Sequence, residues 1–322
     1  MKRALGRISL VAALAFAGLL TAITPAVAAT HHYSRVISSD FADPGFAKFG
    51  TYYYLYKTGA GFGATVSVSP QSGYGPIAAS MPHIPAWVGK DPSGARKLWA
   101  PNVIGMMHNG HALYVMYFTG YSPSHKANCI GVATSSSPDR NFAARSTPTV
   151  CAAQAGYEAI DPSAYRAADG KRYLIYKVNY RNVSGFDIRA VQMDSATGTV
   201  RVAGVASRSK IKPGSRMEAP SVIAHGGQVF IFTSRGNYAD CTYSTDVWAA
   251  PTFWGGTFHR VRTIMSTSST GLCGPGGATV LNDGSTTRIA FHAWKGGTAS
   301  SKVRQTYVGV LKWTSSNVPY LY

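Results

Sequence analysis

Acidic residues are scarce in this sequence of 322 residues. It has 13 Asp and Glu against 31 Lys and Arg, a formal net charge of +18 at pH 7, and only two of the acids are Glu. So basic a chain is expected to adhere to anionic surfaces and substrates at low salt. The basic residues are scattered with no run of five, which argues against nucleic acid and favours an acidic polysaccharide or cell-wall polymer as partner. The alternative is that the basic charge contributes only to solubility.

Long apolar stretches are missing beyond the N-terminus. A basic start, an apolar core at Ile8–Leu20 and the small residues Ala26–Ala28 predict a secretory signal peptide over residues 1–29. The apolar core is too short to span a bilayer comfortably, and no other stretch is a candidate, so we expect no membrane span. The sequence therefore predicts a secreted domain over residues 30–322, large enough for one substantial core.

Cysteine is limited to four residues: Cys129, Cys151, Cys241 and Cys273. None of them has the close Cys-x-x-Cys spacing of common zinc sites, so a metal centre built on cysteine is disfavoured. An even count in an exported chain predicts two disulfides, for which three pairings are open. Pairing of sequence neighbours, Cys129 with Cys151 and Cys241 with Cys273, would close loops that stabilise the fold by about 3 kcal/mol each.

Helical periodicity is also absent, and a repeated hairpin takes its place. Each repeat contains, in order, a small or acidic residue, usually a Pro, an apolar strand, a Gly turn and an aromatic strand. The small or acidic residue that begins each repeat is at position 43, 100, 161, 219 or 277. A regular period of roughly 40–60 residues made only of strands and turns is typical of a propeller. The sequence predicts an all-β, five-bladed β-propeller, with unrelated hairpins in a β-sandwich as the alternative.

Five aromatic and β-branched segments bounded by Gly or polar turns are the strongest strand candidates. They are Tyr52–Tyr56, Leu113–Phe118, Tyr173–Lys177, Val229–Thr233 and Arg288–His292. The last repeat ends near residue 294, so the ring needs a further strand to close. Either the tail Thr306–Trp313 or the N-terminal Ser34–Ile37 should complete the final blade.

Three carboxylates fall at or next to the same point of their repeats, just ahead of the innermost strand: Asp43, Asp161 and Glu218. Innermost strands surround the propeller axis, so these side chains should converge in one funnel. Like charges in a partly dry pocket cannot all ionise easily, and we expect the pKa of one to rise. Such a set suits glycoside hydrolysis, in which one carboxyl protonates the leaving oxygen and another activates water. The alternative is that each acid only caps the entry to its strand.

Four further residues are candidates for this funnel. Arg216 lies on the same face of an extended strand as Glu218 and could bind a carboxylate or a sugar hydroxyl. Trp99 could stack on a sugar ring or belong to the core, and Phe46 could line the funnel. His292 ends the second strand of the fifth repeat and could face the axis or make a hydrogen bond in the core.

These motifs resemble family 43 of the glycoside hydrolases in a secreted actinobacterial type, the five-bladed propellers that cut arabinan, arabinoxylan and xylan. The resemblance covers essentially the whole chain after the predicted signal peptide. It rests on Asp43-Pro44, Trp99-Ala100-Pro101, Asp161-Pro162-Ser163, Glu218-Ala219-Pro220 and His292.

The resemblance implies a role for each residue. Asp43 matches the general base that activates water, and Glu218 matches the general acid. Asp161 matches a third acid that keeps the pKa of the general acid high and positions it. His292 matches a histidine at a central ion, often Ca²⁺, and no organic cofactor is implied. The family inverts the anomeric centre, for which the base and acid are roughly 6.5–9.5 Å apart.

Two features depart from the family pattern. Many members carry a His after the Gly-Pro-Gly of the fifth blade, where this chain has Gly277. Many relatives are acidic, whereas this chain is basic, which suggests pectin-borne arabinan or an arabinose-containing wall polymer as substrate. We therefore expect a secreted, monomeric, inverting glycosidase for arabinose- or xylose-based polysaccharide. A non-catalytic propeller that binds glycan or cell wall is the alternative.

Overall fold

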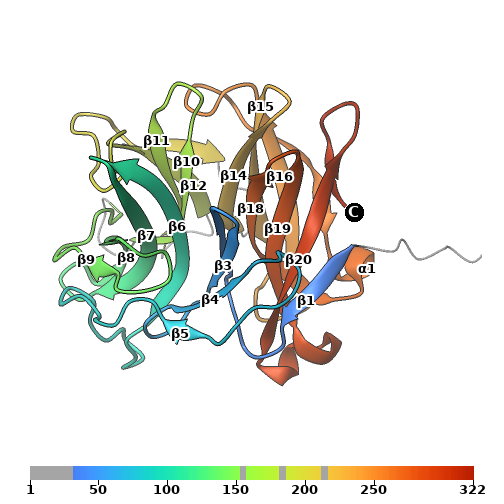
Figure 1. Ribbon diagram of the computed structural model, residues 1–322, viewed down its shortest axis with the longest axis horizontal. Helices are drawn as coiled ribbons and strands as arrows, with labels where there is room; N and C mark the ends of the chain where they lie inside the picture. The colour runs from blue at the N-terminus through green and yellow to red at the C-terminus, as the bar shows by residue number, and fades with distance from the viewer. Residues whose placement is uncertain (1–31, 153–156, 181–185, 212–216) are drawn as a thin grey trace, which may run out of the picture. The chain divides into compact units, whose positions relative to one another are not determined.

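The computed structural model describes residues 32–152, 157–180, 186–211 and 217–322, and these form five antiparallel β-sheets (Figure 1). Each sheet is one blade of a five-bladed β-propeller, as the repeat predicts. The predicted signal peptide at residues 1–29 lies outside the described residues. No helix in the described ranges has the length and apolar character needed to cross a membrane.

The first four blades are built from consecutive strands. Blade 1 contains β2 (Gly45–Phe49), β3 (Tyr52–Tyr56), β4 (Gly63–Ser67) and β5 (Ala78–Ala79). Blade 2 contains β6 (Leu98–His108), β7 (His111–Ser122), β8 (Ala127–Ser135) and β9 (Ala143–Ala144). Blade 3 contains β10 (Tyr157–Arg166), β11 (Arg172–Tyr180), β12 (Phe186–Met193) and β13 (Arg208–Ile211). Blade 4 contains β14 (Met217–His225), β15 (Gln228–Arg235), β16 (Ser244–Ala250) and β17 (His259–Met265).

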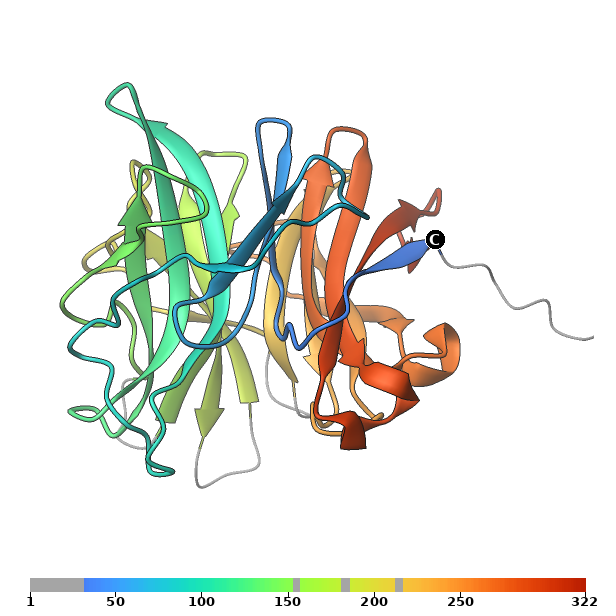
Figure 2. The same cartoon turned by 60° about the horizontal axis from the view of Figure 1, so that its bottom comes forward.

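Blade 5 joins the two ends of the described chain. Its strands are β18 (Cys273–Asp283), β19 (Thr286–Trp294), β20 (Arg304–Trp313), β1 (Tyr33–Ile37) and β21 (Pro319–Leu321). Strands β1 and β21 both pair with β20, one after the other along its length. The blue strand β1 lies beside the red C-terminal strands in both views (Figure 1, Figure 2). Both segments proposed from the sequence for closing the ring are therefore used.

The hydrophobic core consists of layers between neighbouring blades. The aromatic second strands supply much of it: Tyr54 and Tyr56 pack with Phe118 between blades 1 and 2, and Phe230 packs with Phe291 between blades 4 and 5. Every apolar side chain buried there removes surface from water, at about 25 cal/mol per Å². Because each layer takes side chains from two blades, the inner strands are held in fixed positions around the axis.

Regular helix is limited to one short turn in the described part of the chain, α1 (Thr267–Thr270), with the 3₁₀ turns η1 (Lys295–Gly297) and η2 (Ala299–Ser301). Ser266 caps α1 by accepting a hydrogen bond from the Ser269 amide. The cysteines pair as sequence neighbours, Cys129 with Cys151 and Cys241 with Cys273.

Candidate active site

Five residues at the head of the inner strands share an unusual backbone conformation. They have a positive φ in every blade, although only one is glycine: Asp43 (49°), Ala100 (48°), Asp161 (55°), Ala219 (49°) and Gly277 (61°). These are the five positions that mark the sequence repeat. A non-glycine residue in this region costs roughly 1–2 kcal/mol, so the surrounding structure must hold it there. In blades 2 to 5 the pairing of the inner strand is interrupted at this point.

Hydrogen bonds between blades hold these residues. Each backbone N–H donates to a polar side chain of the preceding blade: Asp43 to His292 Nδ1 (3.1 Å), Ala100 to Thr58 Oγ1 (3.0 Å), Asp161 to Thr119 Oγ1 (3.0 Å), Ala219 to Asp161 Oδ2 (3.0 Å) and Gly277 to Ser234 Oγ (2.8 Å). The ring of contacts runs through all five blades. It fixes the backbone that carries the candidate catalytic carboxylates.

A cavity of about 350 Å³ lies at this end of the inner strands, and Asp43, Asp161 and Glu218 all line it. The structure thus brings together three acids that are far apart in the sequence. Trp99 lines the same cavity, and its ring lies 5.8 Å from the Lys97 ammonium. Trp99 thus adds a large aromatic ring to the cavity wall beside the carboxylates.

Asp43 is surrounded by donors. Thr58 donates to its Oδ2 at 2.7 Å, and Arg304 Nη1 lies 3.4 Å from its Oδ1. Burial raises the pKa of the Asp43 carboxyl, but the Arg304 charge and the Thr58 hydrogen bond outweigh burial and leave this pKa below its ordinary value. Asp43 is therefore a carboxylate over the whole physiological pH range, as activation of water requires.

Glu218, in β14, is held at both carboxyl oxygens. Lys177 Nζ from β11 donates to Oε2 at 2.8 Å, and the Tyr243 hydroxyl donates to Oε1 at 2.8 Å. Lys177 precedes Ala219 by 42 residues, the separation that also relates Thr58 to Ala100 and Thr119 to Asp161. Blade 3 thus places a lysine where the first two blades place a threonine. The positive charge of Lys177 lies against the Glu218 carboxyl.

Asp161 is the carboxyl with the raised pKa. Burial and the negative charge of Glu218 raise the pKa of Asp161 to about 7, although Lys177 acts against them. The sequence predicted that one acid of the three would behave in this way. The cavity therefore combines an ionised carboxylate, Asp43, with a neighbouring pair, Asp161 and Glu218, that retains a proton near neutral pH.

His292 lies behind the cavity, with a side chain 1% exposed. Burial, and then the Arg304 charge, lower the pKa of His292 to about 3, so the ring is neutral and its Nδ1 accepts from the Asp43 amide. The buried Nε2 has no hydrogen-bond partner among the described residues. Because Nδ1 accepts, the neutral ring carries its proton on Nε2, so this nitrogen fits a water oxygen and not a direct bond to Ca²⁺, which prefers six to eight oxygen ligands. An ion beside His292 would therefore be coordinated by water.

One predicted binding residue, Phe46, does not line this cavity. Phe46 is 4% exposed and packs on Leu55 and Val308 between blades 1 and 5. Phe46 borders a separate cavity that is lined by the later parts of the inner strands. It lies there because it is three residues after Asp43, within β2. Arg216 lies outside the described residues.

Sequence reasoning missed four residues that contact the carboxylates: Thr58, Lys177, Tyr243 and Arg304. A signal for Lys177 was present, because it occupies the same repeat position as Thr119. Arg304 and Tyr243 had no such signal, since each reaches the cavity from another strand or from a loop.

Comparison with known proteins agrees with this geometry. The model of the family described as "Glycosyl hydrolases family 43" matches residues 33–319. The sequence is similar to "Probable arabinan endo-1,5-alpha-L-arabinosidase A" of Aspergillus fumigatus, with 26% identity over 239 residues that cover 71% of this chain and 68% of the relative.

Solved structures show the same fold. A thermostable family-43 glycoside hydrolase superimposes with a TM-score of 0.73 at 21% identity, covering 91% of this chain and 96% of the other. An alpha-L-arabinanase of Cellvibrio cellulosa gives a TM-score of 0.71 at 20% identity, covering 88% and 96%.

Proposed function

This chain belongs to glycosyl hydrolase family 43 and is a glycosidase that hydrolyses O-glycosyl bonds, and we propose that its substrate is an arabinose- or xylose-containing polysaccharide, with arabinan first. The preference for arabinan follows the arabinosidase and arabinanase among its relatives. The observation that supports the proposed chemistry most strongly is the cavity shared by Asp43, Asp161 and Glu218.

The proposed mechanism is a single displacement. Asp43, kept ionised beside Arg304, removes a proton from water as the water oxygen attacks the anomeric carbon. The one proton that Asp161 and Glu218 retain between them passes from Glu218 to the leaving oxygen, so that the glycosidic bond breaks and a sugar hydroxyl forms. The pair keeps this proton near neutral pH because two carboxyls that close together resist losing both protons. The product would have the inverted anomeric configuration.

A substrate panel with active-site variants tests this proposal. Linear and branched arabinan, arabinoxylan, xylan and chromogenic pentosides would be incubated with the protein, with product length and the anomer first released as readouts. We expect Asp43→Asn and Glu218→Gln to lower kcat by on the order of 10²–10⁴. Asp169→Asn, a change of an exposed charge that does not line the cavity, should match the wild type. Binding of a glycan without turnover by the wild type would instead identify a glycan-binding propeller.

We also propose that the basic charge favours acidic, wall-associated polymers. The net charge of +18 should raise the affinity for uronate-bearing arabinan over neutral arabinan, and added salt should remove the difference. Equal activity on both polymers, unaffected by salt, would refute this part of the proposal.

Secretion remains a proposal that rests on the sequence and on the two disulfides, which are typical of exported proteins. Expression of the full chain in its host with sequencing of the exported N-terminus should find a start near residue 30. Light scattering of the same material tests the expected monomer.

We also propose, from the resemblance, a central ion held beside His292 through water, whose oxygen can accept from the buried Nε2–H. Chelation should lower the melting temperature of the wild type, Ca²⁺ should restore it, and neither should affect His292→Gln. Equal melting temperatures with chelator and with Ca²⁺ would argue against the ion.

A further inference from the structure

Tyr243 is the one phenol in the described chain that the structure bonds to Glu218. Its ring is 2% exposed, and its hydroxyl donates to Glu218 Oε1 at 2.8 Å while Lys177 occupies Oε2. Two donors, one on each oxygen, fix the rotation of the carboxyl. Each oxygen keeps a second lone pair, so the carboxyl can still carry and deliver a proton. Burial, and then the charge of Glu218, raise the pKa of Tyr243 well above 10, which keeps the phenol a donor at any working pH.

The ring of Tyr243 occupies a space that depends on glycine. A Cβ added to Gly276 would lie 2.3 Å from Tyr243 Cε1, a separation that real side chains do not show. The ring also stacks on His292, with centroids 5.9 Å apart and planes inclined by 10°. The Gly-Pro-Gly-Gly sequence at the start of blade 5 therefore gives room to a tyrosine that comes from blade 4.

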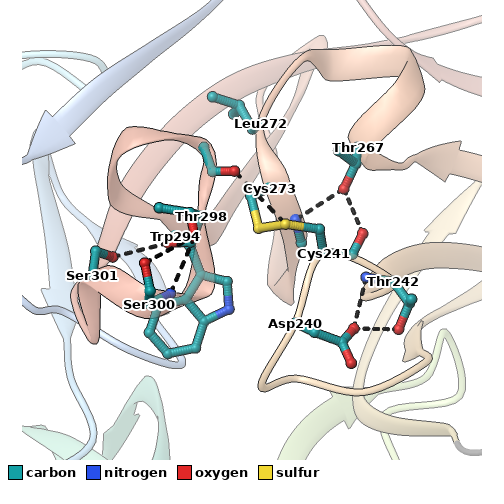
Figure 3. The surroundings of a disulfide bond; sticks show 12 residues. Asp240, Cys241, Thr242, Thr267, Leu272, Cys273, Trp294, Thr298, Ser300 and Ser301 are labelled. Carbon is teal, nitrogen blue, oxygen red and sulfur yellow. Dashed lines mark hydrogen bonds between the residues drawn. A yellow bond between two sulfur atoms is a disulfide. The ribbon is translucent and has the colours of Figure 1, made fainter.

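Tyr243 belongs to a loop that a disulfide fastens to blade 5. Residues 236–243 connect β15 to β16, and Cys241 of this loop is bonded to Cys273, the first residue of β18. Figure 3 shows the bond with its surroundings: Thr267 donates to the Cys241 carbonyl at 2.6 Å and accepts from the Gly274 amide at 3.1 Å. The cross-link lies two residues from Tyr243.

The same loop also forms part of the cavity wall. Tyr238 lines the cavity with a ring that is 54% exposed, and its carbonyl accepts from Trp294 Nε1 of blade 5 at 3.1 Å. Arg304, the neighbour of Asp43, lies 6.0 Å from the Tyr238 ring. The loop thus reaches both the proposed acid and the surroundings of the proposed base.

We infer that Tyr243 is a positioning residue for the Glu218 carboxyl and that the Cys241–Cys273 disulfide keeps it in place, so that this cross-link serves catalysis as well as stability. The inference rests on the proposed role of Glu218 as general acid. The other disulfide provides the contrast, because no described residue between Cys129 and Cys151 lines the cavity.

The first experiment removes one oxygen atom. Tyr243→Phe should lower kcat by on the order of 10- to 100-fold on substrates with a sugar leaving group, with little change in KM, because a hydrogen bond to a charged group is lost. On a dinitrophenyl glycoside, whose leaving group needs no proton, the loss should be several-fold smaller. Tyr180→Phe removes the same atom from a tyrosine that donates to Asp187 and should match the wild type on both substrates.

The second experiment compares the two disulfides. Replacing Cys241 and Cys273 by Ser should lower kcat with the same dependence on the leaving group, and adding Tyr243→Phe should lower it little further, since both changes act on one interaction. Replacing Cys129 and Cys151 by Ser should leave kcat unchanged below the melting temperature. If the first double variant does not fold, reduction of the folded wild type, with mass spectrometry to identify the opened bond, gives the same comparison.

The outcomes separate the inference from the proposed function. A fully active Glu218→Gln would overturn the proposed function and the inference together. Loss of activity in Glu218→Gln with wild-type kinetics of Tyr243→Phe, or with equal losses on both leaving groups, would overturn the inference alone. Full activity of the protein with the Cys241–Cys273 bond opened would refute the role of the disulfide.

Discussion

At the scale of single residues, Asp43 and Asp161 show how surroundings set the chemistry of identical side chains. Both precede a proline, both have a positive φ, and both donate their amide to a side chain of the preceding blade. Yet the pKa of Asp43 is lowered, whereas the pKa of Asp161 is raised to about 7. The difference comes from a neighbour: Asp43 faces the Arg304 guanidinium, and Asp161 faces the Glu218 carboxylate.

The raised pKa of Asp161 has a consequence for stability. The folded protein keeps this proton up to about pH 7, whereas an unfolded chain loses it near pH 4, so the contribution to stability is present at low pH and disappears as the pH rises through 7. Asp161→Asn should remove this dependence. We expect the fall in unfolding free energy between pH 5 and pH 8 to be smaller in the variant by on the order of 3 kcal/mol, measured by urea denaturation.

A matched control is available in Asp169, an exposed acid whose pKa is lowered by Lys171. Asp169→Asn should keep the pH dependence of the wild type. If Asp161→Asn loses stability between pH 5 and pH 8 as steeply as the wild type, Asp161 does not carry the proton.

The sequence allowed the three acids to be placed in one cavity because they recur at one point of a regular repeat. Contacts that cross the repeat could not be found in that way. Tyr243 reaches Glu218 from a loop whose path depends on a disulfide, and Arg304 comes from the strand that closes the ring. Phe46 was placed in the funnel, but its distance along β2 from Asp43 directs it to the core between blades 1 and 5.

At the scale of elements, the start of β18 explains a departure from the family pattern. Where the resemblance implies a histidine after Gly-Pro-Gly, this chain has Gly277, whose added Cβ would lie 2.5 Å from His292 Cε1. The glycine therefore allows the histidine of β19 to approach the axis. Gly276 does the same for Tyr243, so two consecutive glycines accommodate two rings from two different elements.

Gly276→Ala should lower activity by displacing Tyr243. Gly276 has an ordinary φ, so the expected effect comes from the contact with Tyr243 and not from backbone strain. We expect a loss of kcat of at least the size seen in Tyr243→Phe, measured on a polymeric substrate. Gly255→Ala, where an added Cβ meets nothing within 4 Å, should leave kcat unchanged. Wild-type kcat in Gly276→Ala would show that the ring can be placed elsewhere.

The disulfides should contribute similarly to stability, although only one is expected to affect catalysis. They link residues 22 and 32 positions apart, and loops of that size stabilise a fold by about 3 kcal/mol in the chain-entropy account. Replacing Cys129 and Cys151 by Ser should lower the free energy of unfolding by about that amount in urea titrations. A loss confined to the Cys241–Cys273 variant would contradict the equal-loop argument.

At the scale of the whole molecule, the regular period made the fold predictable. Five equal repeats can bury their apolar faces only against each other, and the five core layers between neighbouring blades confirm this. The sequence could not decide which segment completes the final blade, because both candidates are suitable strands. The structure uses both, with β1 pairing to β20 across more than 260 residues of chain.

Closure of the ring by pairing of β1 with β20 predicts different outcomes for two shortened chains. A chain that begins at residue 30 keeps β1 and should fold with the stability of the described domain. A chain that begins at residue 38 lacks β1 and leaves the Thr306–Gly309 part of β20 without a partner, while β21 still pairs with the rest. We expect it to aggregate or to melt at a much lower temperature, as followed by circular dichroism and light scattering. Equal melting of the two chains would show that β1 is dispensable.

Pairing of β1 with β20 also sets the order of events during synthesis. Strand β1 leaves the ribosome more than 260 residues before β20, so the two cannot pair until the strands of the first four blades have emerged. Until then the ring of blades is not closed. Such a delay is compatible with the proposed secretion, in which the polypeptide passes through a translocation pore before it becomes compact.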